Sequence, residues 1–413
     1  MPRFNGRGRQ VTWSIVLSSL IIGVSAAQES ALERAQNEAA RLRQAPKQPE
    51  ETIWKNIKAT REPSAGLHAS LRDWVASLLP KSRVALDAEL LFLTPKVDAE
   101  LRQAGLFRSG ASGDPFESEP GTVTRMEFSR PPEDPDKLVV IVGVDVPCGS
   151  NDAAYIYDYS QGEPRLVLES HGTRDHDEGI TNVRFSKRDA SGSQLILTLR
   201  YAVQCGSSWN MLSYDLFRLS TMASAAVPIL GGEQGIWFAG AHPYHLRIEP
   251  DELLMEVQGS SIDANIHNRE HVLHFNAPGS TAERVDPVAL QPQDFVDEWF
   301  TRPWSEMESR SAESARDKLQ KWHDFLSGDF VAGEFQFVQR CREPADQWQI
   351  AIDLGWIKSG ELPDGLRVYF LVQQSGHYRF TMTGISFERQ EGCPGESDPN
   401  IESPTLFPAD ERH

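Results

Sequence analysis

The chain has 413 residues, which is enough for two or three domains with separate cores and excludes a small peptide scaffold. It holds 41 Lys and Arg against 59 Asp and Glu, so its net charge at pH 7 is −18. This acidity argues against non-specific binding of nucleic acid or anionic membranes, because both require basic surfaces that displace counterions. The remaining composition, 39% hydrophobic and 24% charged, is that of an ordinary globular protein.

Residues 1–26 have the three parts of a secretory signal peptide. Arginines form a positive start, Val11 to Val24 is an apolar run, and small residues up to Ala26 form a cleavage site. A transmembrane anchor is the alternative, but the run is shorter than the roughly 20 residues that span a bilayer. Cleavage would remove three arginines and no acidic residue, which takes the net charge from −18 to −21. We therefore expect an exported protein, periplasmic or secreted, whose mature chain has no membrane span.

The cysteines support this compartment. They are Cys148, Cys205, Cys341 and Cys393. An even number in an exported chain predicts two disulfides, and of the three possible pairings we favour Cys148 with Cys205 and Cys341 with Cys393. Four buried free thiols are the alternative.

Residues 27–108 are predicted to form a helical region with a flexible start. Residues 28–60 are rich in Glu, Gln, Arg and Ala with little apolar periodicity, which favours a solvated helix and a linker. From Leu67 to Leu101, apolar residues recur at helical spacing, which predicts two or three helices with a buried face. A connector rich in turn-forming residues, 109–121, precedes the strands.

Residues 122–286 contain an internal repeat. At an offset of 57 residues and without a gap, ten of the 35 positions from 124 to 158 are identical. The matches include Cys148-Gly149-Ser150 with Cys205-Gly206-Ser207. A weaker third copy starts near His245 and has Gly259-Ser260 without the cysteine. Each copy is predicted to form four strands.

These copies resemble the blades of β-propellers, which are four-stranded antiparallel repeats of roughly 40 to 60 residues. The resemblance implies antiparallel sheets with loops gathered on one face. Three copies are fewer than the roughly four blades that close a ring. A further sheet completing the ring and an open array or sandwich both remain possible.

Residues 287–400 are predicted to form an α+β domain, with 401–413 as a tail. Phe295, Trp299 and then Leu319 to Leu326 have helical spacing, and four strands follow, with Ser375-Gly376 as the turn of the last hairpin. Helices followed by an antiparallel sheet resemble the NTF2-like fold. The order of repeats and Trp-rich helices also resembles bacterial exported proteins without a known activity. The predicted class is therefore mainly β with α: helical start, propeller-like repeats, and a C-terminal α+β domain.

Two His-rich segments are candidate metal sites. His267, Glu270 and His271 match the HxxEH pattern of inverted zinc proteases, which requires both His on one helical face. The alternation from His271 to Phe275 instead indicates a strand. Residues 171–178 gather two His and several acids, but without the spacing of an EF-hand or a known zinc site, so a solvated connector is favoured.

The segments after the second strand of each copy are candidate binding loops. If the copies are blades, these loops share a face, where Asn151, Asp152, Trp209, Asn210 and Asp263 would form a polar surface with one aromatic platform. Such a surface suits a sugar or a peptide. The alternative is that Gly and Ser only form turns and that Trp209 packs inward.

The sequence contains no GxSxG, P-loop, GxGxxG or HExxH motif, so we expect neither a cofactor nor a catalytic residue. The leading hypothesis is a non-catalytic exported binding or scaffold module for an extracytoplasmic ligand or protein. An exported hydrolase, with or without a metal ion, is the second hypothesis.

Overall fold

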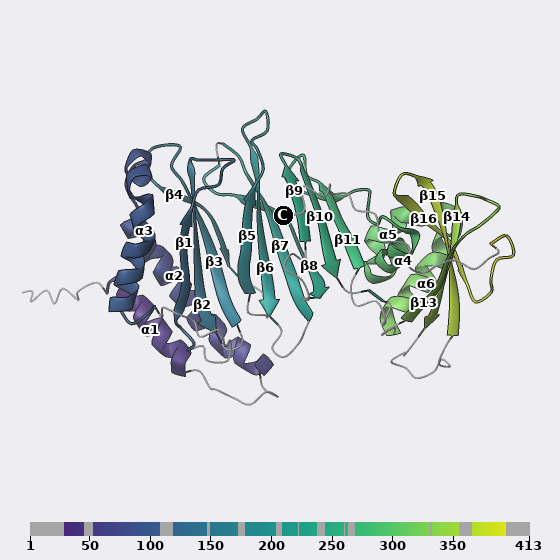
Figure 1. Ribbon diagram of the computed structural model, residues 1–413, viewed down its shortest axis with the longest axis horizontal. Coiled ribbons are helices and arrows are strands. Elements are labelled where there is room, and N and C mark those ends of the chain that lie inside the picture. Colours follow the sequence, from purple (N-terminus) through teal and green to yellow (C-terminus); the bar gives the residue numbers. More distant parts are fainter. Residues whose placement is uncertain are drawn as a thin grey trace, which may run out of the picture.

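The computed structural model describes residues 29–44, 53–107, 119–146, 149–171, 178–203, 209–221, 223–237, 244–259, 261–262, 269–329, 333–354 and 366–393. The predicted signal peptide and the 401–413 tail lie outside these ranges. The chain is mainly β with α: helices come first, antiparallel sheets follow, and helices with a last sheet end it (Figure 1).

Three helices begin the described chain: α1 Ala31–Gln44, α2 Ile53–Leu78 and α3 Arg83–Gln103. In α2 the predicted apolar face is buried, with Leu67 and Leu71 fully inaccessible. The N-cap of α3 is Ser82, whose side chain accepts a hydrogen bond from the backbone N–H of Ala85. Leu91 of α3 departs from the prediction, since it is 84% exposed.

The prediction of a solvated helix for residues 28–60 is wrong for α1. Ala35, Ala39 and Leu42 repeat at intervals of four and three residues and are buried against α2 and the first sheet. Alanine carries little hydrophobic signal, but its small side chain permits close packing. At Gly121, for example, a Cβ would lie 2.7 Å from the backbone O of Ala39.

The repeats form three units of four antiparallel strands. The first unit is β1 Val123–Ser129, β2 Lys137–Val146, β3 Gly149–Asp158 and β4 Arg165–His171. The second is β5 Glu178–Phe185, β6 Gln194–Val203, β7 Trp209–Leu219 and β8 Val227–Trp237. The third is β9 Tyr244–Glu249, β10 Glu252–Gly259, β11 Arg269–Asn276 and β12 Glu283–Arg284. In each unit, neighbours in sequence are neighbours in the sheet, as in a propeller blade.

The first two copies align in sequence without a gap, but the strands of their second hairpins do not pair in the same register. In the first unit Val146 pairs with Gly149, but in the second the equivalent Val203 pairs with Asn210. The second hairpin is therefore four residues longer between its paired ends, and Tyr214-Asp215 pairs differently from Tyr157-Asp158. The register of two strands depends on the turn that joins them. A sequence alignment of the two copies does not show where that turn begins and ends.

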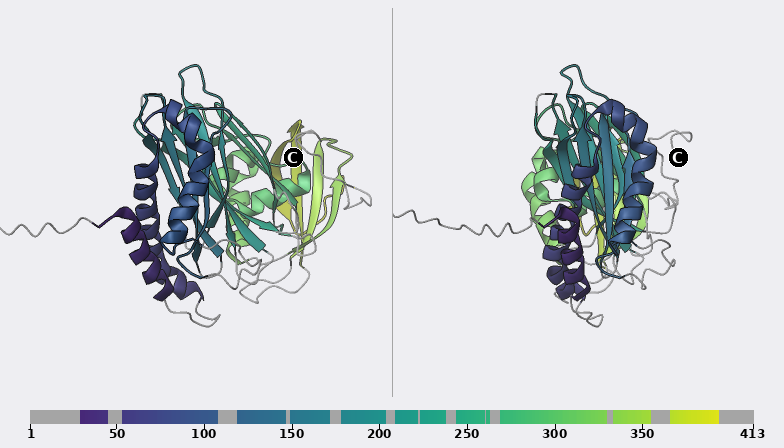
Figure 2. Two further views of the ribbon diagram at one scale, coloured as in Figure 1. Left: turned by 60° about the vertical axis from the view of Figure 1, so that its left-hand side comes forward. Right: turned by 90° about the vertical axis from the view of Figure 1, so that its left-hand side faces the viewer.

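The three units stack face to face, and each interface contains an apolar cluster. One cluster joins the first and second units, including Ile141 and Ile196. Another joins the second and third, including Leu197 and Met255. The N-terminal helices cover the other face of the first sheet, and Figure 2 shows them in front of the sheets when the stack is viewed along its length. The described chain is an open stack with a cap at each end.

The C-terminal unit begins with α4 Pro292–Thr301, α5 Trp304–Met307 and α6 Arg316–Asp329. The strands β13 Gly333–Arg340, β14 Gln347–Leu354, β15 Leu366–Gly376 and β16 Arg379–Ser386 form a four-stranded antiparallel sheet. Phe295, Trp299 and Leu319 pack on one face of this sheet. The turn of the last hairpin is His377-Tyr378 rather than the predicted Ser375-Gly376, because Gly376 still pairs with Arg379 and Tyr378 has a φ of 55°.

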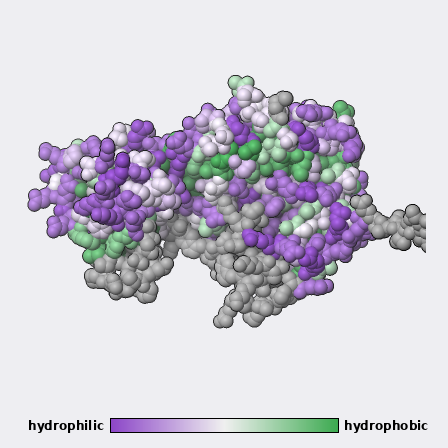
Figure 3. Space-filling view, turned by 180° about the vertical axis from the view of Figure 1, so that it is seen from behind, coloured by the Kyte–Doolittle hydropathy of each residue, from purple (hydrophilic) through white to green (hydrophobic). Residues whose placement is uncertain are grey.

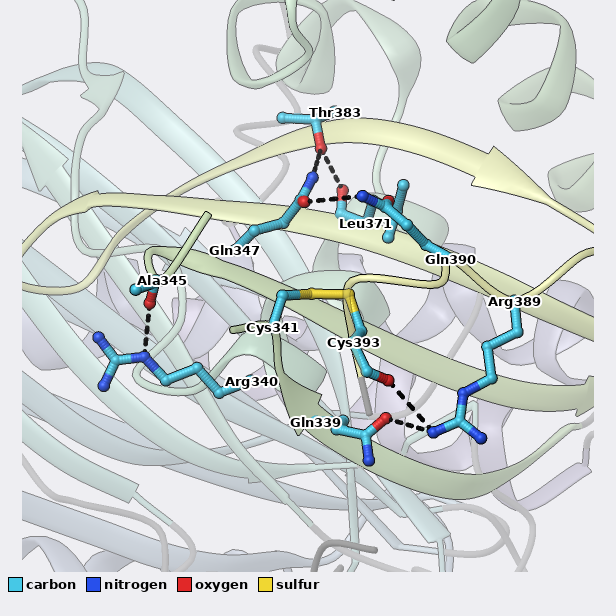
Figure 4. Close-up of a disulfide and its surroundings, with 10 residues drawn as sticks. All are labelled: Gln339, Arg340, Cys341, Ala345, Gln347, Leu371, Thr383, Arg389, Gln390 and Cys393. Atoms are coloured by element: carbon cyan, nitrogen blue, oxygen red, sulfur yellow. Dashed lines mark hydrogen bonds between the residues drawn. A yellow bond between two sulfur atoms is a disulfide. The ribbon is translucent and has the colours of Figure 1, made fainter. Parts of the chain in front are cut away.

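Cys341 and Cys393 form a disulfide, which confirms that predicted pairing. It connects the residue after β13 to the segment that follows β16, at the other edge of the sheet (Figure 4). Arg389 of this segment donates from Nη2 to Gln339 Oε1 at 2.8 Å, and Arg342 N donates to Gly392 O at 3.0 Å. The disulfide therefore holds the segment that follows β16 against the β13 edge of the sheet. Cys148 and Cys205 lie outside the described residues.

No described helix is both long and apolar enough to cross a membrane. Seen from behind, the surface is hydrophilic over most of the C-terminal unit, while hydrophobic residues form a band over the sheet stack (Figure 3).

Candidate functional site

The strands of the three units end at a common edge. The ends of β2, β6 and β10 and the starts of β3, β7 and β11 lie along one side of the stack, here called the loop edge (Figure 1). A rigid sheet edge of this kind positions side chains for binding.

Three half-buried residues meet at the loop edge between the second and third units. Asn182 of β5 donates from Nδ2 to the hydroxyl oxygen of Tyr244 in β9 at 3.2 Å. The ring of Tyr244 lies beside that of Tyr201 in β6, with 6.4 Å between centroids and 45° between the ring planes. We call Asn182, Tyr201 and Tyr244 the tyrosine site. Its amide, the Tyr244 hydroxyl and the rings can hydrogen-bond and stack on a ligand at the same time, whereas the Tyr201 hydroxyl is buried.

Asn210 is the predicted binding residue with the best position for this site. It is half-buried in β7 and pairs with Val203 of β6, two residues from Tyr201. The other members were not predicted, because they come from three strands and belong to no local motif. One feature of the sequence could have pointed to Tyr201. At the offset of 57, this tyrosine aligns with the aliphatic Val144 of the first copy.

Asn151 and Asp152 do not form the expected common surface. They lie within β3 rather than in a loop, because β2 and β3 stay paired as far as Val146 and Gly149. Consecutive strand residues point to opposite faces. The backbone O and Oδ1 of Asn151 lie 3.0 Å from His68 Nε2 in α2, while Asp152 Oδ2 accepts from Ile180 N in β5 at 3.0 Å.

Asp152 is a buried structural acid. Its Oδ1 accepts a 2.7 Å hydrogen bond from Ser150 Oγ, and Oδ2 lies 3.8 Å from Arg125 Nη1. Burial raises the pKa of Asp152 to about 6, although the Ser150 hydrogen bond and the Arg125 charge favour the ionised form. These partners connect the first and second units.

Trp209 begins β7, and its side chain lies outside the described part, as do Asp263 and His267. Glu270 and His271 are consecutive residues of β11, which confirms the predicted strand and places them on opposite faces of it. Most of the 171–178 segment also lies outside. Among the described residues, no group of three or more His, Cys, Asp and Glu could hold a metal ion.

A buried site with several charged residues lies between the third unit and α4. Glu298 Oε1 accepts from Arg269 Nη2 at 2.9 Å and lies 3.0 Å from His271 Nδ1. Its Oε2 accepts from Arg284 Nη2 at 2.9 Å and from Arg302 Nε at 3.0 Å. Burial by itself favours the neutral acid, but Arg284 and Arg302 outweigh it and hold the pKa of Glu298 well below its ordinary value. We call these five residues the Glu298 network.

The network connects three parts of the chain. Arg269 and His271 come from β11, Arg284 comes from β12, and Arg302 also donates from Nη2 to Gln234 Oε1 in β8 at 3.0 Å. Burial and the Arg269 charge lower the pKa of His271, so its imidazole is neutral at pH 7. The sequence did not indicate this network, because its members are charged residues from separate elements.

No known family model matches the chain, and no curated protein matches it. Among solved structures, it is similar to a glycoside hydrolase family 43 β-1,3-galactosidase in complex with galactodeoxynojirimycin. That likeness has a TM-score of 0.19 and 10% identity, and covers 68% of this chain and 80% of the other. A likeness this low supports no conclusion about function. The resemblances to NTF2-like and exported proteins receive no support from these comparisons.

Proposed function

We propose that the protein is a non-catalytic binding module that takes a sugar or a peptide at the tyrosine site. The observation that carries this proposal is the hydrogen bond between Asn182 and Tyr244 beside the ring of Tyr201. All three side chains are half-buried, so the packed core holds them while part of each reaches solvent.

The chemistry of the site suits a ligand with both apolar and polar faces. A tyrosine ring packs against the C–H face of a sugar or against a peptide side chain, and an amide both donates and accepts hydrogen bonds. Since β5, β6 and β9 are strands of packed sheets, the groups are already positioned before binding, which lowers the entropic cost.

The buried charges support a non-catalytic role. Both oxygens of Glu298 accept hydrogen bonds from protein side chains, and both oxygens of Asp152 accept protein hydrogen bonds. A catalytic carboxyl needs a free oxygen within reach of the substrate. The exported hydrolase stays the alternative, and the raised pKa values of two buried acids, Asp152 and Asp294, support it.

Export is part of the proposal. The Cys341–Cys393 disulfide supports it, because disulfides persist mainly in oxidising compartments. The signal-like N-terminus points the same way.

The test is a ligand screen of the purified chain with soluble oligosaccharides and peptides, followed by calorimetry on each hit. Tyr244→Ala should weaken binding about tenfold or more, since it removes a ring and a hydroxyl, and tenfold equals about 1.4 kcal/mol. Tyr244→Phe should show a smaller loss, which isolates the hydroxyl.

Tyr369→Ala is the matched control. Tyr369 is also half-buried and lies beside an aromatic ring, with 6.1 Å between its centroid and that of Phe337, but it is in the C-terminal sheet. Its replacement should leave the affinity unchanged. A hit that binds Tyr244→Ala and the unmodified chain equally would refute the tyrosine site, and turnover of a hit would favour the hydrolase.

A further inference from the structure

Asp294 is a buried acid at the boundary between the third unit and the C-terminal unit. It lies in the first turn of α4, only 6% exposed. Its backbone O accepts a hydrogen bond from Arg269 Nη1 of β11, which attaches this turn to the third unit. Within the described chain, its carboxyl Oδ2 is buried and has no hydrogen-bond partner.

The neighbours of Asp294 make a negative charge there unfavourable. Asp297 and Glu298 follow it by three and four residues, which places all three carboxyls on one side of the helix. Arg269 is the cation they share, and it already lies 2.9 Å from Glu298 and 3.4 Å from Asp297. Asp297 Oδ1 is also buried without a partner. Glu270 adds a further negative charge.

We infer that Asp294 acts as a proton-operated latch, which keeps α4 docked on β11 while protonated and loosens this contact when it ionises. The protonated carboxyl needs no cation and places no third negative charge beside Arg269. It can also donate to a neighbouring carboxylate, which an ionised Asp294 cannot do.

The direction of the pH effect follows from the two states of the carboxyl. Burial raises the pKa of docked Asp294 to about 7, with Arg269 opposing and Asp297 adding to the shift. In an undocked, exposed helix its pKa would return to about 3.9. The docked form therefore binds the proton more tightly. Its population relative to the undocked form falls about tenfold per pH unit from about pH 4 to pH 7, then stays constant.

Two titratable neighbours of Asp294 have pKa values that are shifted downward. The pKa of Glu298 is held well below its ordinary value, so it stays ionised. The pKa of His271 is lowered by burial, so this side chain is neutral at pH 7.

The test is hydrogen exchange followed by mass spectrometry on the full chain from pH 5 to pH 8.5, corrected for the intrinsic pH dependence of exchange. Peptides from α4 and β11 should show an opening constant that rises up to about a hundredfold from pH 5 to pH 7 and is level above that. Peptides from β6, which belongs to neither cap, provide the internal reference.

Asp294→Asn replaces the carboxyl with a neutral group of the same shape. It should remove the rise and keep α4 protected at pH 8. Asp297→Asn is the comparison variant: Asp297 Oδ2 accepts from Ile262 N at 3.0 Å, so this variant should be less stable. It should keep a pH dependence that ends at a lower pH, because the Asp297 charge adds to the pKa shift of Asp294. A level opening constant in the unmodified chain, or a rise that persists in Asp294→Asn, would overturn the latch. If Asp294→Asn does not fold, the pH dependence of the opening constant in the unmodified chain is the test of the latch.

Discussion

The two ends of the sheet stack are capped by opposite means. At the N-terminal end, Leu67 and Leu71 of α2 share one apolar cluster with Val140 and Tyr155 of the first sheet. At the C-terminal end, the third sheet contributes Leu254 and Val272 to a small cluster, and the Glu298 network supplies the ion pairs to α4. Apolar packing depends little on pH or salt, whereas buried ion pairs fail if one partner is lost. Apolar packing therefore contributes most of the buried contact at the N-terminal cap, whereas buried ion pairs are prominent at the C-terminal cap.

The N-terminal cap contains a buried histidine, His68, whose pH response has the opposite sign. Burial and the charge of His171 lower the pKa of His68 to about 4. Its Nδ1 is buried without a partner in the described chain, so an added proton would have no acceptor. Acid should loosen this end, whereas acid should tighten α4 through Asp294.

The largest effect should come from Glu298→Gln. This change leaves Arg269, Arg284 and Arg302 buried without their shared carboxylate, and removing one partner of a buried ion pair costs about 3–5 kcal/mol. Urea unfolding followed by tryptophan fluorescence measures the loss, because Trp299 follows Glu298 in α4. Glu306→Gln is the control: Glu306 is 42% exposed and 3.7 Å from Arg284, so its loss should be small. Equal losses of unfolding free energy in Glu298→Gln and Glu306→Gln would show that the Glu298 network does not stabilise this cap.

A somewhat smaller effect should come from Leu71→Ala at the other end. Leu71 is fully buried, and truncating such a side chain leaves a cavity that costs about 3 kcal/mol. Unfolding at low and at high salt distinguishes the two caps, because this loss should be the same in both. Leu91→Ala, on the exposed face of α3, should change stability by less than about 0.5 kcal/mol. A Leu71→Ala loss that depends strongly on salt would contradict an apolar cap.

The smallest effect, when it is measured for each single pH unit, should appear in the pH dependence of the N-terminal cap. His68 contributes its full stability above about pH 6.5, and this contribution is lost as pH falls toward its pKa of about 4. Exchange of α2 peptides should therefore accelerate by up to tenfold per pH unit below pH 6.5. His68→Gln keeps an amide donor for Asn151 and should remove this acceleration. If α2 and α4 respond to acid in the same direction, the opposition between the caps is wrong.

Much of the fold was predictable because strands and helices leave periodic patterns. The alternating and aliphatic runs of the repeats gave four strands per unit, and Leu67, Leu71 and Trp74 gave α2. Three features left no such pattern. The packing of α1 depends on Ala35 and Ala39, whose burial carries little hydrophobic signal. The register of the second hairpin depends on its turn, and the open stack depends on contacts between units.

The candidate site was less predictable than the fold. Residues near the Gly-Ser segments were reasonable candidates, and Asn210 does lie near the tyrosine site. Asn151 and Asp152 were chosen as loop residues, but β3 begins earlier than the Gly-Ser pattern indicated. Their side chains are used to connect neighbouring layers. Pairing between strands decides which residues reach a free surface, and sequence spacing alone does not determine it.

Because caps end the stack, its length is not fixed by the geometry of ring closure. A propeller must contain the number of blades that closes the circle, whereas a capped stack can gain or lose a sheet wherever two neighbouring faces match. Between the second and third units, the backbone ladder consists of the single pair Gly259 and Ile236. The rest of their contact comes from side chains: an apolar cluster, the hydrogen bond from Asn182 to Tyr244, and hydrogen bonds from Arg218 to the backbone O of Ala277 and Gly279. Duplication of one unit would therefore lengthen the protein without altering its ends, which offers evolution and protein engineers a modular spacer of adjustable size.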